Sequence, residues 1–299
     1  MAEASRQAKY PQQQISRNIG STLGFVYVSN AIKHEIRVFW YFTWRDLSAS
    51  LIPGMACTIA ALRSLDSPPS TEVIIRSLGR SIVYFLLYTY SFDIANQING
   101  VDEDRINKPD RPLSSGRSSL PGAYIRWYAT TALFLVLGAA WAVFPWTALF
   151  VVITIYTSFY DGDKHWTTKN LLFMSTGSLC ILQAAWGLAA PITTRETRWA
   201  LLLSGAFGIV ASVQDMRDIE GDKVAGRRTL PIVLGSHFRS VMAAAICTVP
   251  AICWKLDLLR HSHWLVSYCG VLLTLAMFYM AYRVLRGHSP EYDHQTYMV

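Results

Sequence analysis

Charged residues are scarce in this sequence. Asp, Glu, Lys and Arg make up 16% of its 299 residues, whereas 52% of the residues are hydrophobic. Soluble domains carry about 25% charged residues, so an ordinary soluble domain is excluded. The composition and several long apolar runs predict an all-α, polytopic membrane protein. The ten Trp and fifteen Tyr residues are suited to anchoring such a protein at two membrane interfaces.

Cysteine motifs are missing as well. The five Cys residues all lie in apolar segments, and no two of them form a CxxC pair. We therefore interpret the five side chains as small buried hydrophobes. The N-terminal segment is polar and charged through Arg17, which predicts that the chain has no secretory signal peptide.

Apolar segments of membrane length run through most of the chain. A bilayer requires about 20 apolar residues per helix, and backbone hydrogen bonds must close within each helix. The sequence therefore predicts a transmembrane helical bundle of eight, possibly nine, spans. The eight candidate spans lie at about 46–64, 72–98, 120–143, 145–160, 169–190, 199–217, 237–254 and 262–285.

The distribution of basic residues predicts an orientation. If the N-terminus is cytosolic, most of the 27 Lys and Arg residues fall on the cytosolic side. The positive-inside rule favours this arrangement. The net charge of +7 is then explained by lipid headgroups and phosphorylated ligands better than by nucleic acid.

The first of two acidic clusters follows the second predicted span. Asn96, Gly100 and Asp104 are spaced by four, so they line one stripe of a continuing helix. Asp102 and Glu103 add two carboxylates beside that stripe. Ionisable groups at the membrane are costly, which makes them functional candidates.

The second acidic cluster follows the sixth predicted span. Asp215, Asp218 and Asp222 lie at i, i+3 and i+7, again on one helix face. An even number of spans separates the two clusters, so both emerge on the cytosolic side. Mg²⁺ is bound by a few carboxylates together with substrate phosphates, and two opposed acidic faces are suited to hold it. The alternative is a pair of solvated loops with ordinary ion pairs.

Basic residues accompany both clusters. They can bind phosphate groups and stabilise the negative charge of a departing phosphorylated group. Arg111 lies in the rigid segment Lys-Pro-Asp-Arg-Pro, which favours a functional role over a headgroup contact. The candidate phosphate ligands are Lys108, Arg111, Tyr160, Lys164, Lys223 and Arg227.

These motifs resemble those of the UbiA superfamily of intramembrane prenyltransferases. Residues Asn96–Gly116 resemble its first Asp-rich motif, and Asp215–Pro231 resemble its second. Tyr160 and Lys164 resemble its tyrosine–lysine motif between helices four and five. The likeness covers about residues 45–285 in the order of the family. It implies a helical bundle around a central cavity, capping cytosolic loops, two Mg²⁺ ions and an isoprenyl diphosphate substrate.

The resemblance also implies roles and a division of the chain. The catalytic residues implied are Asn96, Asp104, Arg111, Asp218 and Asp222, and the metal ligands implied are Asn96, Asp102, Glu103, Asp104, Asp215, Asp218 and Asp222. The expected segments are a mobile polar tail (1–30), an interfacial amphipathic helix (31–45), the UbiA-like catalytic domain (46–285) and a polar C-terminal tail (286–299). We expect an integral protein of the endoplasmic reticulum or another endomembrane, and the oligomeric state stays open.

Two positions depart from the usual first motif, and they bear on the reaction. Gln97 follows Asn96, and Gly100 stands at the middle Asp position. This pattern resembles a fungal branch that includes terpene cyclases. Tyr88 and Phe92 precede the motif, and their ring faces can stabilise a carbocation. We favour a cyclase over a transferase that moves the prenyl group to a small acceptor. A lipid-binding protein or transporter is the third alternative.

Overall fold

The described chain is helical. The computed structural model describes residues 28–256, 264–287 and 289–297. Within these ranges, the extended backbone pairing is limited to one isolated bridge between His165 and Arg228. Most of the predicted N-terminal tail, residues 1–27, lies outside the described residues. The all-α prediction is confirmed.

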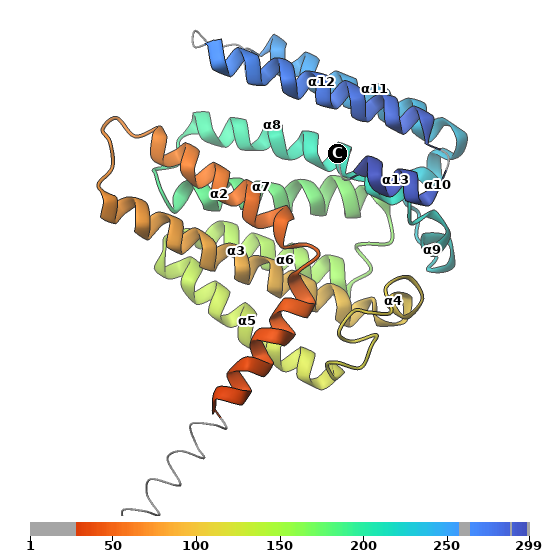
Figure 1. The fold of residues 1–299 in the computed structure, drawn as a ribbon, viewed down its shortest axis with the longest axis horizontal. Helices are drawn as coiled ribbons and strands as arrows, with labels where there is room; N and C mark the ends of the chain where they lie inside the picture. The colour runs from red at the N-terminus through yellow and green to blue at the C-terminus, as the bar shows by residue number, and fades with distance from the viewer. Residues whose placement is uncertain (1–27, 257–263, 288, 298–299) are drawn as a thin grey trace, which may run out of the picture.

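Each of the eight predicted spans corresponds to a helix (Figure 1). The fifth span begins as a π-helix, η1 (Thr167–Met174), and η2 (Ala211–Met216) continues the sixth as a 3₁₀ helix. The remaining long helices are α2 (Leu47–Arg63), α3 (Thr71–Asn99), α5 (Leu120–Ala140), α6 (Phe144–Phe159), α7 (Ser175–Gly187), α8 (Thr194–Val210), α11 (Phe238–Lys255) and α12 (Trp264–Arg286).

Several helices have the length and surface that a bilayer requires. Four described segments are long and apolar enough to cross a membrane: Leu120–Ala140, Thr194–Met216, Leu230–Lys255 and Trp264–Arg286. Large apolar side chains are exposed along the outer faces of α5, α8 and α12. Exposed apolar surface of this extent marks contact with lipid.

Local sequence determines where several helices begin. The Ser70 hydroxyl accepts a hydrogen bond from the Val73 backbone N–H at the start of α3, and Ser119 does the same for Gly122 at the start of α5. Thr193 and Glu196 form a reciprocal capping box at the start of α8. Such caps satisfy backbone N–H groups that have no partner within the helix.

Short helices gather at one end of the bundle. They are α4 (Val101–Asn107), α9 (Ile219–Val224), α10 (Leu230–Leu234), η3 (Gly235–His237) and α13 (Pro290–Tyr297). In Figure 1 the labelled ones lie together on the right, with α4 packed against α9 and α13 packed against η2. Both acidic clusters therefore lie at the same end, as the even number of intervening spans predicts.

Aromatic rings fill much of the interior between α3, α5, α6 and α7. Tyr88 stacks on Phe150 with ring centroids 3.5 Å apart, and its hydroxyl donates to the Gly177 carbonyl at 2.9 Å. Phe92 stacks on Phe173, one turn nearer the first acidic cluster. Buried aromatic pairs of this kind supply a large part of the packing energy of a core.

The segment before α2 forms a helix over residues 28–43 that docks on the bundle. Arg126 of α5 donates two hydrogen bonds to Glu35, at 2.6 and 2.7 Å, and these bonds lower the pKa of Glu35. Gln97 donates to the carbonyl of Phe42 at 3.3 Å. Gln97 thus connects this helix to α3, which gives the Gln after Asn96 a structural role.

Helix α8 packs closely against η1 at Gly208. A Cβ on Gly208 would lie 2.9 Å from the Asn170 carbonyl oxygen, whereas a Cβ on Gly205 would meet nothing within 4 Å. Gly208→Val should therefore lower the free energy of unfolding by about 1–3 kcal/mol through overpacking. Gly205→Val is the matched control on the same helix. Thermal unfolding of both variants in detergent checks this, and equal melting temperatures would contradict it.

Candidate functional site

Backbone hydrogen bonds bring the predicted 4–5 loop onto the second acidic cluster. The Arg228 N–H donates to the Lys164 carbonyl at 2.7 Å, and the Trp166 N–H donates to the Arg228 carbonyl at 3.1 Å. The Lys164 region and the segment after α9 are thereby held side by side. The tyrosine–lysine motif and the second acidic cluster, which the sequence identifies separately, therefore lie next to each other at the polar end.

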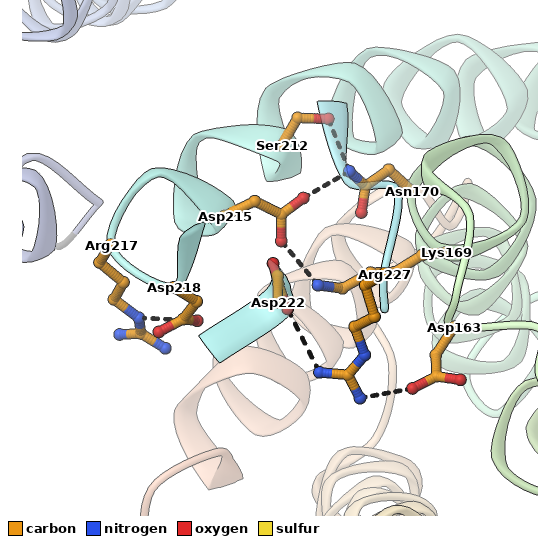
Figure 2. Close-up of polar contacts among 9 residues, drawn as sticks. All are labelled: Asp163, Lys169, Asn170, Ser212, Asp215, Arg217, Asp218, Asp222 and Arg227. Carbon is orange, nitrogen blue, oxygen red and sulfur yellow. Dashed lines mark hydrogen bonds and ion pairs between the residues drawn. The ribbon is translucent and has the colours of Figure 1, made fainter. Parts of the chain in front are cut away.

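Asp215 of η2 binds two side chains of η1. It is fully buried, and its two oxygens accept from Lys169 at 2.7 Å and from Asn170 at 2.8 Å. Asn170 also donates to the Ser212 hydroxyl, so three hydrogen bonds join η1 to η2 (Figure 2). With both oxygens engaged by protein donors, Asp215 serves to hold η1 against η2.

Asp222 has a different environment. Its Oδ1 accepts from Arg227 at 3.3 Å, and Arg227 also donates to Asp163 at 2.5 Å (Figure 2). Its Oδ2 is buried and, within the described part of the chain, accepts no hydrogen bond. Burial raises the pKa of Asp222, and the nearby Lys169 and Arg227 oppose this effect. Asp222 therefore presents a buried lone pair that a cation can occupy.

Asp218 lies between these two carboxylates along the chain and is more exposed than either. Its side chain is 35% exposed and accepts from the adjacent Arg217 at 3.3 Å. Arg217 also contacts His294 of α13 at 2.8 Å. Arg217 therefore links α13 to the second acidic cluster.

The first acidic cluster centres on Asp104. This side chain is buried at 3% exposure and accepts from Arg111 at 2.7 Å. The other guanidinium arm of Arg111 lies 4.0 Å from Asp46, at the start of α2. Burial lowers the pKa of Arg111, but the carboxylates of Asp104, Asp46 and Asp93 outweigh it, and the net pKa is raised. Arg111 therefore stays charged at the centre of an acidic environment.

Lys108 lies near both clusters. It is half-buried and lies within electrostatic range of Asp104 from the first cluster and Asp218 from the second. Burial, with the repulsion of Arg111, lowers the pKa of Lys108. A charged amine between two acidic motifs is well placed to bind an anion that both motifs approach.

The other predicted ligands are less enclosed. Asp102 is exposed and pairs with Arg105 at 2.6 Å, and Lys164 pairs with Asp161 at 2.9 Å. Tyr160 and Lys223 are exposed, and Asn96 is half-buried in the last turn of α3. The side chain of Glu103 lies outside the described residues.

Sequence reasoning missed several residues of the site. Lys169 and Asn170 lie inside an apolar segment, and Asp163 belongs to a short polar loop. They are far from Asp215 and Asp222 in the sequence, so no helical spacing relates them to these carboxylates. The only available signal was a lone Lys at the start of a membrane-length segment, which is costly unless it is paired.

The carboxylate arrangement fits a metal that shares its ligands with a substrate. Among the described side chains, no three His, Cys, Asp or Glu lie close enough to form a complete metal site by themselves. Mg²⁺ usually takes one or two carboxylates and completes its shell with water and phosphate oxygens. The unpartnered Oδ2 of Asp222 and the all-oxygen donor set match that chemistry.

Two fungal relatives align with nearly the whole chain. The chain is 37% identical to the diterpene cyclase eriG of Hericium erinaceus over 268 residues, covering 89% of this chain and 85% of eriG. It is 34% identical to the polyprenyl transferase eriF of the same fungus, covering 89% of this chain and 91% of eriF.

A solved structure shares the fold. A UbiA homolog from Archaeoglobus fulgidus bound to GPP and Mg²⁺ matches with a TM-score of 0.64 and 16% identity, over 88% of this chain and 100% of that one. The pattern of the UbiA prenyltransferase family matches residues 50–299. The chain therefore belongs to the UbiA prenyltransferase family.

Proposed function

We propose that this protein is a terpene cyclase that ionises an isoprenyl diphosphate in the membrane and closes the prenyl chain on itself. The observation that carries the proposal is the meeting of two acidic motifs and several cations at one end of an aromatic-filled bundle. An isoprenyl diphosphate has the same division, with a charged head and an apolar tail. The relationship to eriG supports cyclisation.

The diphosphate head would bind at the polar end. Asp104, Asp218 and Asp222, with Asn96, would hold Mg²⁺, two ions in our proposal. Bound Mg²⁺ would neutralise the charge that develops on the leaving diphosphate. Lys108, Arg111 and Arg227 would contact the phosphate oxygens, with Tyr160, Lys164 and Lys223 at the exposed rim. Asp215 is better suited to position Lys169 than to bind metal, because protein donors occupy both of its oxygens.

The carbon–oxygen bond would break heterolytically at this end. Diphosphate leaves with the electron pair, and the prenyl chain becomes an allylic cation. Tyr88 and Phe92 lie on α3 below the first motif, where their ring faces would stabilise positive charge. A distal double bond of the same chain then attacks the cation, and loss of a proton gives the neutral hydrocarbon. The buried interior keeps water away from the cation.

A prenyl transferase is the second candidate. It shares the ionisation step and differs in the nucleophile, which would be a small acceptor molecule. The relationship to eriF favours it, at an identity close to that of eriG. Gly100 at the middle Asp position of the first motif favours the cyclase, since that departure resembles the cyclase branch.

The proposed orientation places the polar end on the cytosolic side of the membrane. The excess of Lys and Arg near this end supports that side. We further propose an endomembrane, such as the endoplasmic reticulum, as the location. The helix over residues 28–43 would then lie at the cytosolic interface, with its exposed Ile32 and Ile36 toward lipid.

Acceptor-free turnover distinguishes the candidates. The purified protein is incubated with farnesyl or geranylgeranyl diphosphate and Mg²⁺, and diphosphate and hydrocarbon are both quantified. We expect a cyclic hydrocarbon in equal molar amount to the diphosphate, with loss of both when EDTA is added. Turnover only after an aromatic acceptor is supplied would identify a transferase. Absence of diphosphate release under both conditions would reject both enzymes.

Substitution of the carboxylates tests their role. Asp222→Asn and Asp104→Asn should each lower turnover by more than about 100-fold, because each removes a charged oxygen ligand of the metal. The melting temperature of Asp222→Asn should change little, since Asn keeps the shape of the side chain, whereas Asp104→Asn also removes the buried ion pair with Arg111 and should lower it. Asp66→Asn is the control, because Asp66 is exposed in the loop between α2 and α3.

Rates of diphosphate release at saturating Mg²⁺ give the measurement. If the variants of Asp104, Asp218 and Asp222 all keep turnover within tenfold of the starting protein, the metal-binding assignment is wrong.

A further inference from the structure

Asp93 is a buried carboxylate that the site described above does not use. It lies on α3, one turn before Asn96, and its side chain is 1% exposed. Neither of its oxygens accepts a hydrogen bond from any described residue. A buried, unpartnered carboxylate is strongly destabilising. A cationic donor that reached Asp93 would therefore stabilise its charged form.

One cation is within range. Asp93 interacts electrostatically with Arg111 and with the neighbouring carboxyl of Asp46. Arg111 donates to Asp104 at 2.7 Å through Nη1, while Nη2 lies 4.0 Å from Asp46. A single guanidinium therefore stands among three carboxylates and bonds closely to only one of them.

That one bond conflicts with metal binding. The proposed function, on which this inference rests, requires the Asp104 carboxylate as a metal ligand. A guanidinium on Oδ2 of Asp104 occupies an oxygen that the metal needs, and its positive charge repels the metal. Arg111 and a divalent cation therefore compete for Asp104. If the metal takes Oδ2, Arg111 loses its closest bond and needs another acceptor.

We propose that Asp93, together with Asp46, receives the Arg111 guanidinium when Asp104 binds a divalent cation. Asp93 is then a positioning residue that sets metal affinity by stabilising the displaced arginine. One arm of Arg111 already lies 4.0 Å from the carboxylate of Asp46. The movement also keeps the guanidinium at the polar end, where it can contact the diphosphate.

A purely structural role for Asp93 makes a different prediction. Asn has almost the same shape, so Asp93→Asn would leave packing and metal affinity unchanged if the side chain only filled space. If Asp93 receives Arg111, the same substitution weakens the acceptor and leaves Arg111 on Asp104. Metal affinity then falls although Asp93 is not itself a ligand.

Mn²⁺ binding to the full-length protein in detergent, without substrate, tests the proposal. Electron paramagnetic resonance measures the free Mn²⁺ at each total concentration. Asp93→Asn should raise the Kd for Mn²⁺ about tenfold, within the range of coupling between linked sites. Asp110→Asn is the matched control. Asp110 precedes Arg111 in the loop after α4, but its carboxylate pairs with Arg45. The Kd of this variant should stay within about twofold of the starting value.

A double-mutant cycle isolates the contribution of Arg111. In the Arg111→Gln background no guanidinium competes for Asp104, so adding Asp93→Asn should change the Kd by less than about twofold. Any direct attraction between Asp93 and the metal would be the same in both backgrounds. An equal tenfold loss in both backgrounds, or no loss in the Asp93→Asn single variant, would overturn the proposal.

A second variant keeps the test decisive if Asp93→Asn does not fold, which size-exclusion chromatography reports. Asp46→Asn should raise the Kd about threefold, and only while Arg111 is present. An unchanged Kd for that variant overturns the proposal. Failure of the proposed function gives a different result: the starting protein would show neither saturable Mn²⁺ binding nor diphosphate release.

Discussion

Pairing between buried carboxylates and cations holds the polar end of this protein together. Asp215 with Lys169 and Asn170 fixes η1 against η2, and Asp104 with Arg111 fixes the loop after α4. A carboxylate removed from water has to find a donor, so each pair fixes the position of one segment. Some of the same oxygens are the proposed metal ligands. The charge pairs that stabilise the metal-free fold therefore determine how much rearrangement metal binding requires.

The bundle separates two kinds of environment along α3. Toward its C-terminal end the helix presents Asn96 and continues into the acidic α4, while one turn earlier Phe92 packs on Phe173. Docking of peripheral segments closes the polar end. Arg239 holds α13 through two hydrogen bonds to Asp293, at 2.7 and 3.0 Å. A substrate with a charged head and an apolar tail is thereby oriented by the fold before any chemistry occurs.

Cyclisation and prenyl transfer use the same ionisation step and differ in what captures the cation. The two fungal relatives, one named a cyclase and one a transferase, are similar to this chain at 37% and 34% identity. The acidic motifs serve the shared step in our proposal. In this proposal, the difference between the outcomes would lie in what captures the cation, a double bond of the same prenyl chain or a second molecule.

The sequence by itself determined the helical class, the positions of the eight long helices and the location of both acidic clusters at one end. Hydropathy and the number of spans between the two clusters can be read along the chain. Predictions that rest on them therefore require no knowledge of tertiary contacts. Only the tertiary structure decided which side chains meet. It joined Lys169 to Asp215, 46 residues away, exposed Asp102 beside Arg105, and left Asp93 buried without a donor among the described residues. Such pairings depend on how helices rotate and pack against one another, and local sequence patterns do not encode that rotation.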